Sequence, residues 1–220
     1  MNKHMRPAIC FIFFLLLLSF SAEVKAQDQE DGLDFGIRQI VEWGSPGTRV
    51  RDIQGVGVFV EYAFDQNWTQ VIAYDRLEFD LNAPCYTVNI IPSPLDNEID
   101  SYVAAHRFGL ETEYHFSPES RWDPYAGVSL EYYAYSVKNL RGVDAYGNAY
   151  DLTIKAPDSF GVGIKFGGSY RFNESLKLGM AVSYSRTFSS FKVEDAVSGT
   201  AGKIKAFAPL GVSAQVTCDF

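Results

Sequence analysis

The chain lacks a long apolar run after its first 26 residues, although 47% of its 220 residues are hydrophobic. A membrane-spanning helix needs about 20 consecutive apolar residues, so residues 27–220 contain no candidate for one. Their apolar side chains alternate instead with small and polar ones, which is the pattern of β-strands. Histidine and cysteine are also scarce, with three of each.

Residues 1–26 have the composition of a secretory signal peptide. Lys3 and Arg6 give a positive start, an apolar run extends over residues 8–20, and residues 24–26 (Val-Lys-Ala) fit a small-residue cleavage site. We expect this segment to be removed and residues 27–220 to form one domain. The alternative is that it stays as an uncleaved N-terminal anchor.

The remaining chain has an excess of negative charge. Removal of the signal takes away three of the 19 Lys and Arg and one of the 27 Asp and Glu, which leaves 16 against 26 and a formal charge of −10. So acidic a chain is a poor binder of nucleic acid. Only Cys85 and Cys218 remain, and a cysteine pair in an exported protein suggests a disulfide.

The strongest strand signals lie in the last third of the chain. In residues 159–172 apolar residues occupy every second position except at Gly168, and the face between them is mostly Gly and Ser with one Lys and one Arg. Eight segments alternate in this way: residues 33–43, 56–64, 69–81, 101–116, 125–137, 159–172, 176–188 and 204–220. The third is the weakest, because Asp75 shares a face with Val71, Ala73, Leu77 and Phe79, and we expect a bulge there or a strand that leaves the apolar layer early.

The connections between these strands alternate in length. Short turns follow strands 2, 4 and 6, whereas long segments rich in Gly, Pro, Asn and Asp follow strands 1, 3, 5 and 7. This pattern predicts an all-β fold, an eight-stranded antiparallel up-and-down transmembrane β-barrel with short periplasmic turns and long extracellular loops. The predicted loops are residues 44–55, 82–100, 139–158 and 189–203. Because a hydrocarbon band of about 25 Å would separate Cys85 from Cys218, we expect free thiols.

The polar face of the strands favours a membrane barrel over a soluble, lipocalin-like one. A soluble barrel would cover its solvated outer face with Lys, Glu and Thr, whereas small residues suit the narrow interior of eight strands. The apolar face carries bulky side chains, which lipid requires of the outside of a closed sheet. We therefore place the chain in the outer membrane of a Gram-negative cell, exported by its signal peptide.

An aromatic–x–aromatic pattern precedes each short turn, as in YRFNES at residues 170–175, and recurs about every fifty residues. Aromatic rings concentrate at the two membrane–water boundaries of such barrels, so we predict a periplasmic aromatic girdle. Its members are Tyr62, Phe64, Trp68, Tyr114, Phe116, Trp122, Tyr170, Phe172 and Phe220.

On these features the chain resembles the small eight-stranded outer-membrane barrels that include OmpX, OmpW and the OmpA transmembrane domain. Residues 123–133 (DPYAGVSLEYY) are similar to the PYxGxGxGY strand of that superfamily, with Ser129 and Glu131 in place of small residues, and residues 170–178 (YRFNESLKL) to its YxFNDNWxL turn. The terminal Phe220 resembles the C-terminal signature that the barrel insertion machinery recognises. The resemblance covers residues 33–220 and implies a monomer among outer-membrane lipid and lipopolysaccharide.

Charged residues fall at several inward positions of the predicted barrel. In a narrow lumen charges are costly unless paired, so we expect a salt-bridged plug. Glu111 and Glu113 could instead form a catalytic pair, because residues two apart on a strand face the same way. The predicted lumen charges are Arg38, Glu42, Glu61, Arg76, Glu78, Arg107, Glu111, Glu113, Glu131, Lys165 and Arg171.

We expect no catalytic residue, metal or cofactor. A lipid A deacylase or palmitoyltransferase would need a group such as His–Ser–acid near the outer rim, but His106 is predicted to point to lipid and His115 to lie at the periplasmic end. The resemblance to OmpW implies passage of small hydrophobic molecules. The resemblance to OmpX implies a structural or surface-interaction protein instead, and a lipid A-modifying enzyme is the remaining alternative.

Overall fold

The computed structural model describes residues 33–44, 50–81, 103–137, 140–143, 149–197, 199, 201–204 and 208–219. The predicted signal peptide, Cys85 and Phe220 lie outside the described residues. In the part of the chain that is described, no helix is both long enough and apolar enough to span a membrane.

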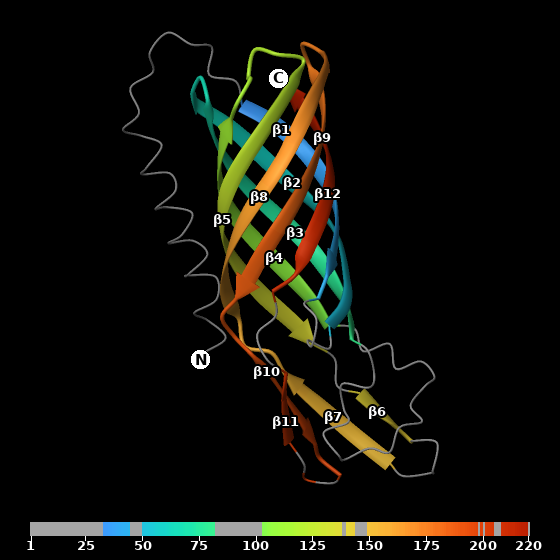
Figure 1. The fold of residues 1–220 in the computed structure, drawn as a ribbon. Helices are drawn as coiled ribbons and strands as arrows, with labels where there is room; N and C mark the ends of the chain where they lie inside the picture. Colours follow the sequence, from blue (N-terminus) through green and yellow to red (C-terminus); the bar gives the residue numbers. More distant parts are fainter. Residues whose placement is uncertain are drawn as a thin grey trace. The chain divides into compact units, whose positions relative to one another are not determined.

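Eight antiparallel strands close into a barrel, as predicted (Figure 1). The order around the barrel is β1-β12-β9-β8-β5-β4-β3-β2, and the last strand closes on the first from Asp34↔Asp219 to Trp43↔Leu210. The strands are β1 (Leu33–Trp43), β2 (Val50–Asp65), β3 (Trp68–Leu81), β4 (Val103–His115), β5 (Trp122–Val137), β8 (Ser159–Asn173), β9 (Leu176–Thr187) and β12 (Leu210–Asp219).

The predicted loops 139–158 and 189–203 are not simply loops. They carry four short strands that form a second sheet in the order β11-β10-β7-β6 (Figure 1). These strands are β6 (Leu140–Val143), β7 (Ala149–Lys155), β10 (Phe191–Asp195) and β11 (Ala201–Ile204). The prediction of one strand over residues 204–220 was therefore wrong at its start, because Ile204 ends β11 and the barrel strand begins at Leu210.

The short turns all lie at one end of the barrel, which we call the short-turn end. Residues with short polar side chains close them, since such side chains can bond to nearby backbone groups. Asp65 Oδ1 accepts from the backbone N–H of Gln66 at 2.5 Å, and Asn173 Oδ1 accepts from that of Ser175 at 3.0 Å. Asn67 ties two turns together by donating to the carbonyl of His115 at 2.7 Å.

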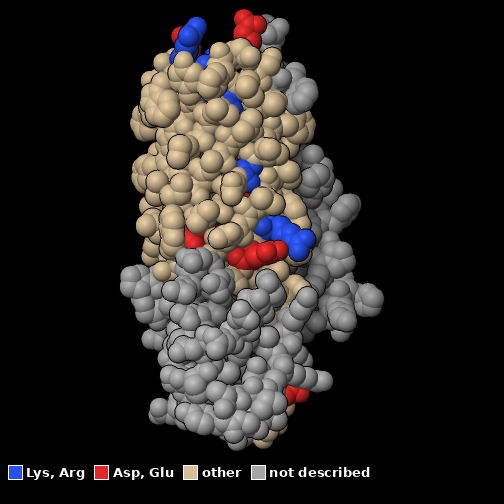
Figure 2. Space-filling model, turned by 90° about the vertical axis from the view of Figure 1, so that its right-hand side faces the viewer, with Lys and Arg blue, Asp and Glu red and all other residues tan. Residues whose placement is uncertain are grey.

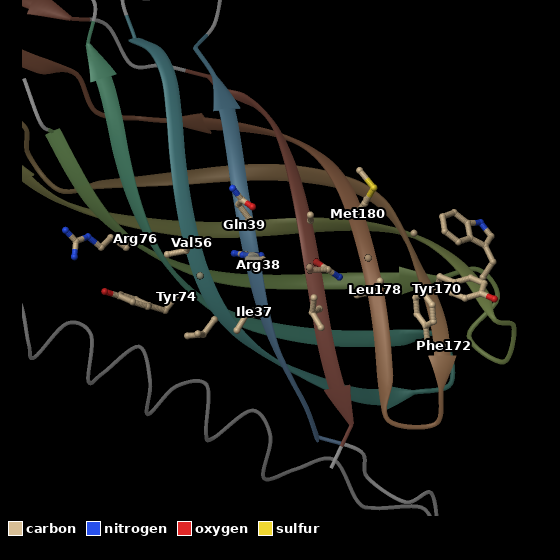
Figure 3. Close-up of a pocket in the computed structure, with 18 residues that line it drawn as sticks. Ile37, Arg38, Gln39, Val56, Tyr74, Arg76, Tyr170, Phe172, Leu178 and Met180 are labelled. Carbon is tan, nitrogen blue, oxygen red and sulfur yellow. The ribbon is translucent and has the colours of Figure 1, made fainter. Parts of the chain in front are cut away.

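The outer wall of the barrel is apolar and its inner wall is small or polar. Ile37 is 62% exposed on β1, and on β8 every second side chain from Phe160 to Phe166 is exposed. Figure 3 shows Ile37, Val56 and Leu178 on the outer side of their strands, and Figure 2 shows one side of this wall largely free of charged side chains. A protein surrounded by water would bury these residues, so the inverted arrangement fits a surface that faces lipid.

Strand β3 turns the opposite way from the prediction. Asp75 and its apolar face-mates Val71 and Leu77 are buried inside the barrel, whereas the alternate residues face outward. The prediction placed every apolar face toward lipid, but the interior is itself apolar at the end opposite the short turns. The assignment of Arg76 and Glu78 to the lumen was therefore wrong, since their side chains are 62% and 58% exposed on the outer wall.

An arginine on the outer wall should be most costly halfway up the lipid belt. Val182 lies four residues above Leu178, which pairs with the girdle residue Tyr170, so it stands roughly 10 Å above the girdle. Val182→Arg should therefore destabilise the barrel by about 2–4 kcal/mol, measured by urea unfolding in lipid vesicles. The control Val162→Arg, level with Arg186 and roughly 20 Å up, should cost at most about 1 kcal/mol. Equal costs at the two heights would contradict this placement of the belt.

Candidate functional site in the barrel interior

The centre of the barrel is a buried carboxylate held between two arginines. Asp75 has 0% relative exposure and projects inward from β3. Arg38 of β1 donates to both of its carboxylate oxygens, from Nε and Nη2 at 2.8 Å each, and Arg107 of β4 donates from Nε at 2.8 Å. Guanidinium and carboxylate groups match in this way because both are planar and can form paired hydrogen bonds.

Further ion pairs extend this centre to other strands. The Nη1 atom of Arg107 lies 2.6 Å from Glu42 Oε1, and the Nη1 atom of Arg38 lies 2.7 Å from Glu111 Oε1. Lys165, on β8, forms ion pairs with both Glu111 and Glu113. The network therefore joins β1, β3, β4 and β8, and its side chains cross the interior of the barrel. We call Asp75, these six residues and the nearby Glu131 the charged plug: Arg38, Glu42, Asp75, Arg107, Glu111, Glu113, Glu131 and Lys165.

Glu131 completes the plug through hydroxyl groups. Tyr133 donates to its Oε2 atom at 2.6 Å, and Ser129 and Ser185 donate to its Oε1 atom at 3.0 Å each. These donors come from β5 and β9, so the polar layer continues around the far side of the barrel. A buried carboxylate without a cation is tolerated when several hydrogen bonds satisfy it.

Glycines provide the room that the plug needs. A Cβ atom at Gly57 would lie 1.9 Å from Asp75 Oδ1, and one at Gly36 would lie 2.1 Å from the ring of Phe59. That ring lies under Arg38, whose Cζ atom is 6.0 Å from the ring centroid. Glycine is therefore required at these inner-wall positions, because large or charged side chains from neighbouring strands occupy the space that a Cβ atom would need.

A cluster of apolar side chains fills the end of the interior away from the short turns. Phe191 of β10 belongs to it with 1% exposure, and its ring contacts that of Tyr135 edge-on, with centroids 4.9 Å apart. The second sheet thus contributes a side chain to the barrel interior. The buried members of this apolar cluster are Ile40, Ile53, Leu77, Phe79, Val103, Ala105, Tyr133, Tyr135 and Phe191.

The short-turn end of the interior holds a small polar cavity of about 130 Å³. Glu61, His115 and Arg171 line it. His115 Nδ1 lies 2.6 Å from Asp123 Oδ2, and Arg171 Nη2 donates to the carbonyl of Pro118 at 3.2 Å. Lys177 and Asp34, which the sequence prediction did not name, form an ion pair here. The predicted lumen residues Glu61 and Arg171 therefore lie in this cavity and not in the charged plug.

The geometry around Glu111 and Glu113 gives no support to a catalytic pair. Both carboxylates form ion pairs with Lys165, and Glu111 also pairs with Arg38, so both are engaged by cations. His106 lies on the outer wall, where its Nδ1 atom is 2.7 Å from the hydroxyl of Tyr74. Within the described ranges, no group of three or more His, Cys, Asp or Glu side chains could hold a metal ion.

The predicted girdle residues lie around the short-turn end of the outer wall. Three pairs of rings contact edge-on. Their centroids are 5.1 Å apart for Trp68 and Tyr114, 5.2 Å for Tyr114 and Phe116, and 5.1 Å for Tyr170 and Phe172. Phe64 and Trp122 are exposed at the same end, Tyr62 is half-buried on β2, and Phe220 lies outside the described residues. The hollow drawn in Figure 3 is lined mostly by outward side chains of the outer wall, and it therefore faces lipid.

Asp75 is the central residue that the sequence prediction missed. Its signal was present, because a charged residue inside an otherwise apolar run requires a partner. The apolar residues around Asp75 predict a lipid-facing row, and on that face of the strand a carboxylate has no predicted partner. The alternate residue Arg76 was assigned inward for the same reason.

A family model supports the same architecture. The model described as "Outer membrane protein beta-barrel domain" matches residues 12–206. No match is found among curated proteins.

Solved structures with the same fold include several small barrels. The outer membrane protein OprG from Pseudomonas aeruginosa is similar with a TM-score of 0.55 and 17% identity, covering 86% of this chain and 97% of that one. The outer membrane protein AlkL has a TM-score of 0.53 and 14% identity, covering 89% of this chain and 93% of that one. Neisserial surface protein A has a TM-score of 0.52 and 18% identity, covering 86% of this chain and 96% of that one. At these identities the likeness concerns the fold.

Two glycine substitutions separate close packing in the plug from a general effect of losing glycine. At Gly57 a new Cβ would collide with Asp75 Oδ1 and approach the backbone oxygen of Tyr74 to 2.8 Å, whereas at Gly109 the nearest atom is 3.5 Å away. Gly57→Ala should therefore lower the free energy of unfolding by about 1–3 kcal/mol. Gly109→Ala should leave it unchanged or raise it slightly. Urea unfolding in lipid vesicles measures both, and equal effects would contradict the packing of Asp75.

Proposed function

The chain belongs to the outer membrane protein beta-barrel domain family and lies in the outer membrane, and from this premise we propose a non-enzymatic barrel with a closed lumen. Its role is to hold the sheet of β6, β7, β10 and β11 outside the cell as a surface for interaction. Short turns face the periplasm in such barrels and long loops face outward. The second sheet belongs to the long loops and so stands on the outer side.

The observation that carries this proposal is the filled interior. The charged plug joins strands on different sides of the barrel at mid-height, and the apolar cluster occupies the extracellular half. Eight strands leave an interior just wide enough for side chains to fill. A water-filled path would have to break several buried ion pairs at once, and each broken pair leaves an unpaired charge in a dry environment.

The extracellular sheet is joined firmly to the barrel. Phe191, the first residue of β10, is packed inside the apolar cluster, and β10 then pairs with β7 and β11. Lys155 of β7 and Glu194 of β10 form an ion pair at 2.5 Å on the exposed surface. A sheet fixed in this way presents a defined surface, which suits binding better than a set of unstructured loops would.

Passage of small hydrophobic molecules is the second candidate, and the apolar cluster is the observation that favours it. A polar channel would carry polar side chains in its extracellular half, whereas here Ile53, Leu77 and Val103 are fully buried there. An apolar solute could enter only by displacing this packing. The two candidates therefore differ in whether the cluster opens.

Reconstitution into planar bilayers and vesicles tests the closed lumen. The purified mature protein should produce no conductance steps above those of protein-free lipid. Vesicles containing it should take up a small apolar fluorescent solute no faster than empty vesicles do. Stable conductance would contradict the closed lumen, and accelerated uptake without conductance would favour the second candidate.

Removal of the sheet tests the surface role separately. In a variant with short Gly-Ser linkers in place of residues 138–158 and 192–207, which keeps Phe191 in the apolar cluster, the barrel should keep its heat-modifiable gel mobility. Cells that carry this variant should attach less to protein-coated surfaces than cells with the intact chain. Equal attachment would count against an interaction surface on this sheet.

The absence of enzyme activity has its own test. In cells that overexpress the intact chain, lipid A should be unchanged, and modified lipid A would contradict a non-enzymatic barrel.

A further inference from the structure

The outer wall carries two exposed arginines above a long uncharged stretch. Along the outward positions of the described barrel strands, the first charged side chains met above the periplasmic girdle are Arg76 on β3 and Arg186 on β9. All outward residues between the girdle and these two are uncharged. A charged residue on the lipid face is destabilising in proportion to its depth, so its presence here requires a partner or a boundary.

Both arginines stand at the same height. Arg76 lies eight residues above the girdle residue Trp68, which pairs with Tyr114. Arg186 lies eight residues above Leu178, which pairs with the girdle residue Tyr170. Eight residues on a strand tilted by about 40° rise roughly 20 Å, and the apolar band of such barrels is about 25 Å tall. Long arginine side chains at this level reach the outer headgroup layer.

The two arginines also lie on opposite sides of the barrel. Strands β3 and β9 are separated by three strands in either direction around the closed order β1-β12-β9-β8-β5-β4-β3-β2. Each arginine therefore meets a different region of the outer leaflet. The two arginines are therefore too far apart to contribute to one site, and each can bind lipid independently of the other.

The surroundings of Arg76 leave its guanidinium available. Its one ion pair in the described structure is with Glu78, at 3.5 Å, and both side chains are more than half exposed. Directly across from it on β4, His106 is bonded to Tyr74, and their rings stack with centroids 5.9 Å apart.

We propose that Arg76 and Arg186 bind phosphate groups of the outer-leaflet glycolipid, lipopolysaccharide, and so fix the height of the barrel in the membrane. Guanidinium groups bind phosphate through paired, charge-assisted hydrogen bonds, which favours arginine over lysine at such positions. Basic residues at a membrane surface also attract anionic lipid by charge alone. Both contributions act on the phosphates of the lipid A portion.

Titration with lipid A tests the proposal on the full mature protein. Bisphosphorylated lipid A is added to the protein in zwitterionic detergent, and bound lipid is measured by native mass spectrometry. Arg76→Gln and Arg186→Gln should each weaken binding about tenfold, and the double variant should lose both contributions. Lys192→Gln, which removes one exposed positive charge from the extracellular sheet, should bind lipid A as the unaltered protein does.

Dephosphorylated lipid A separates phosphate recognition from general attraction to acyl chains. It should bind the unaltered protein no better than the bisphosphorylated form binds the double variant. Equal binding of the two lipids to the unaltered protein would overturn the proposal, even if the double variant failed to fold. Arg186→Lys should keep part of the affinity, because it keeps the charge and loses the paired hydrogen bonds.

Discussion

The carboxylate of Asp75, held between Arg38 and Arg107, is the interaction on which the rest of the interior depends. Without this anion the two buried guanidinium groups would repel each other, and each would be left with a single carboxylate partner. With it, each arginine can bond a second carboxylate, Glu111 in one case and Glu42 in the other. These ion pairs occupy the middle of the lumen, which we propose to be closed. Neighbouring strands carry glycine where the charged side chains take up the space beside the backbone.

The two ends of the interior differ in chemistry. Toward the periplasm it is polar and includes a small cavity, whereas toward the outside it is apolar and accepts Phe191 from the second sheet. The extracellular sheet is therefore an extension of the packed interior. On the outer wall, apolar side chains face lipid up to the level of Arg76 and Arg186, which are the first charged side chains above the periplasmic girdle in the described strands. The same chain thus presents apolar side chains to the lipid and pairs its charges in the interior.

Much of this fold could be predicted from the sequence, because β8 and β9 alternate apolar residues with small or polar ones along most of their length. The direction of β3 could not, since Val71, Leu77 and Phe79 look like lipid-facing residues until the apolar interior of the extracellular half is known. Asp75 was assigned to the wrong side for that reason. The strands β6, β7, β10 and β11 were missed because segments of four to seven residues show too little alternation and pair across two separate loops. Most charges of the plug could be named, but not their partners, which depend on how the strands are staggered.

A double-mutant cycle between Asp75 and Arg107 tests the central interaction most directly. The free energies of unfolding of Asp75→Ala, Arg107→Ala and the double variant would be compared with that of the unaltered protein in lipid vesicles. If the two side chains bond inside the barrel, removing both should cost about 1–3 kcal/mol less than the sum of the single losses. Additive losses, with a coupling below about 0.5 kcal/mol, would show that Asp75 and Arg107 do not meet and would contradict the closed, charge-paired lumen.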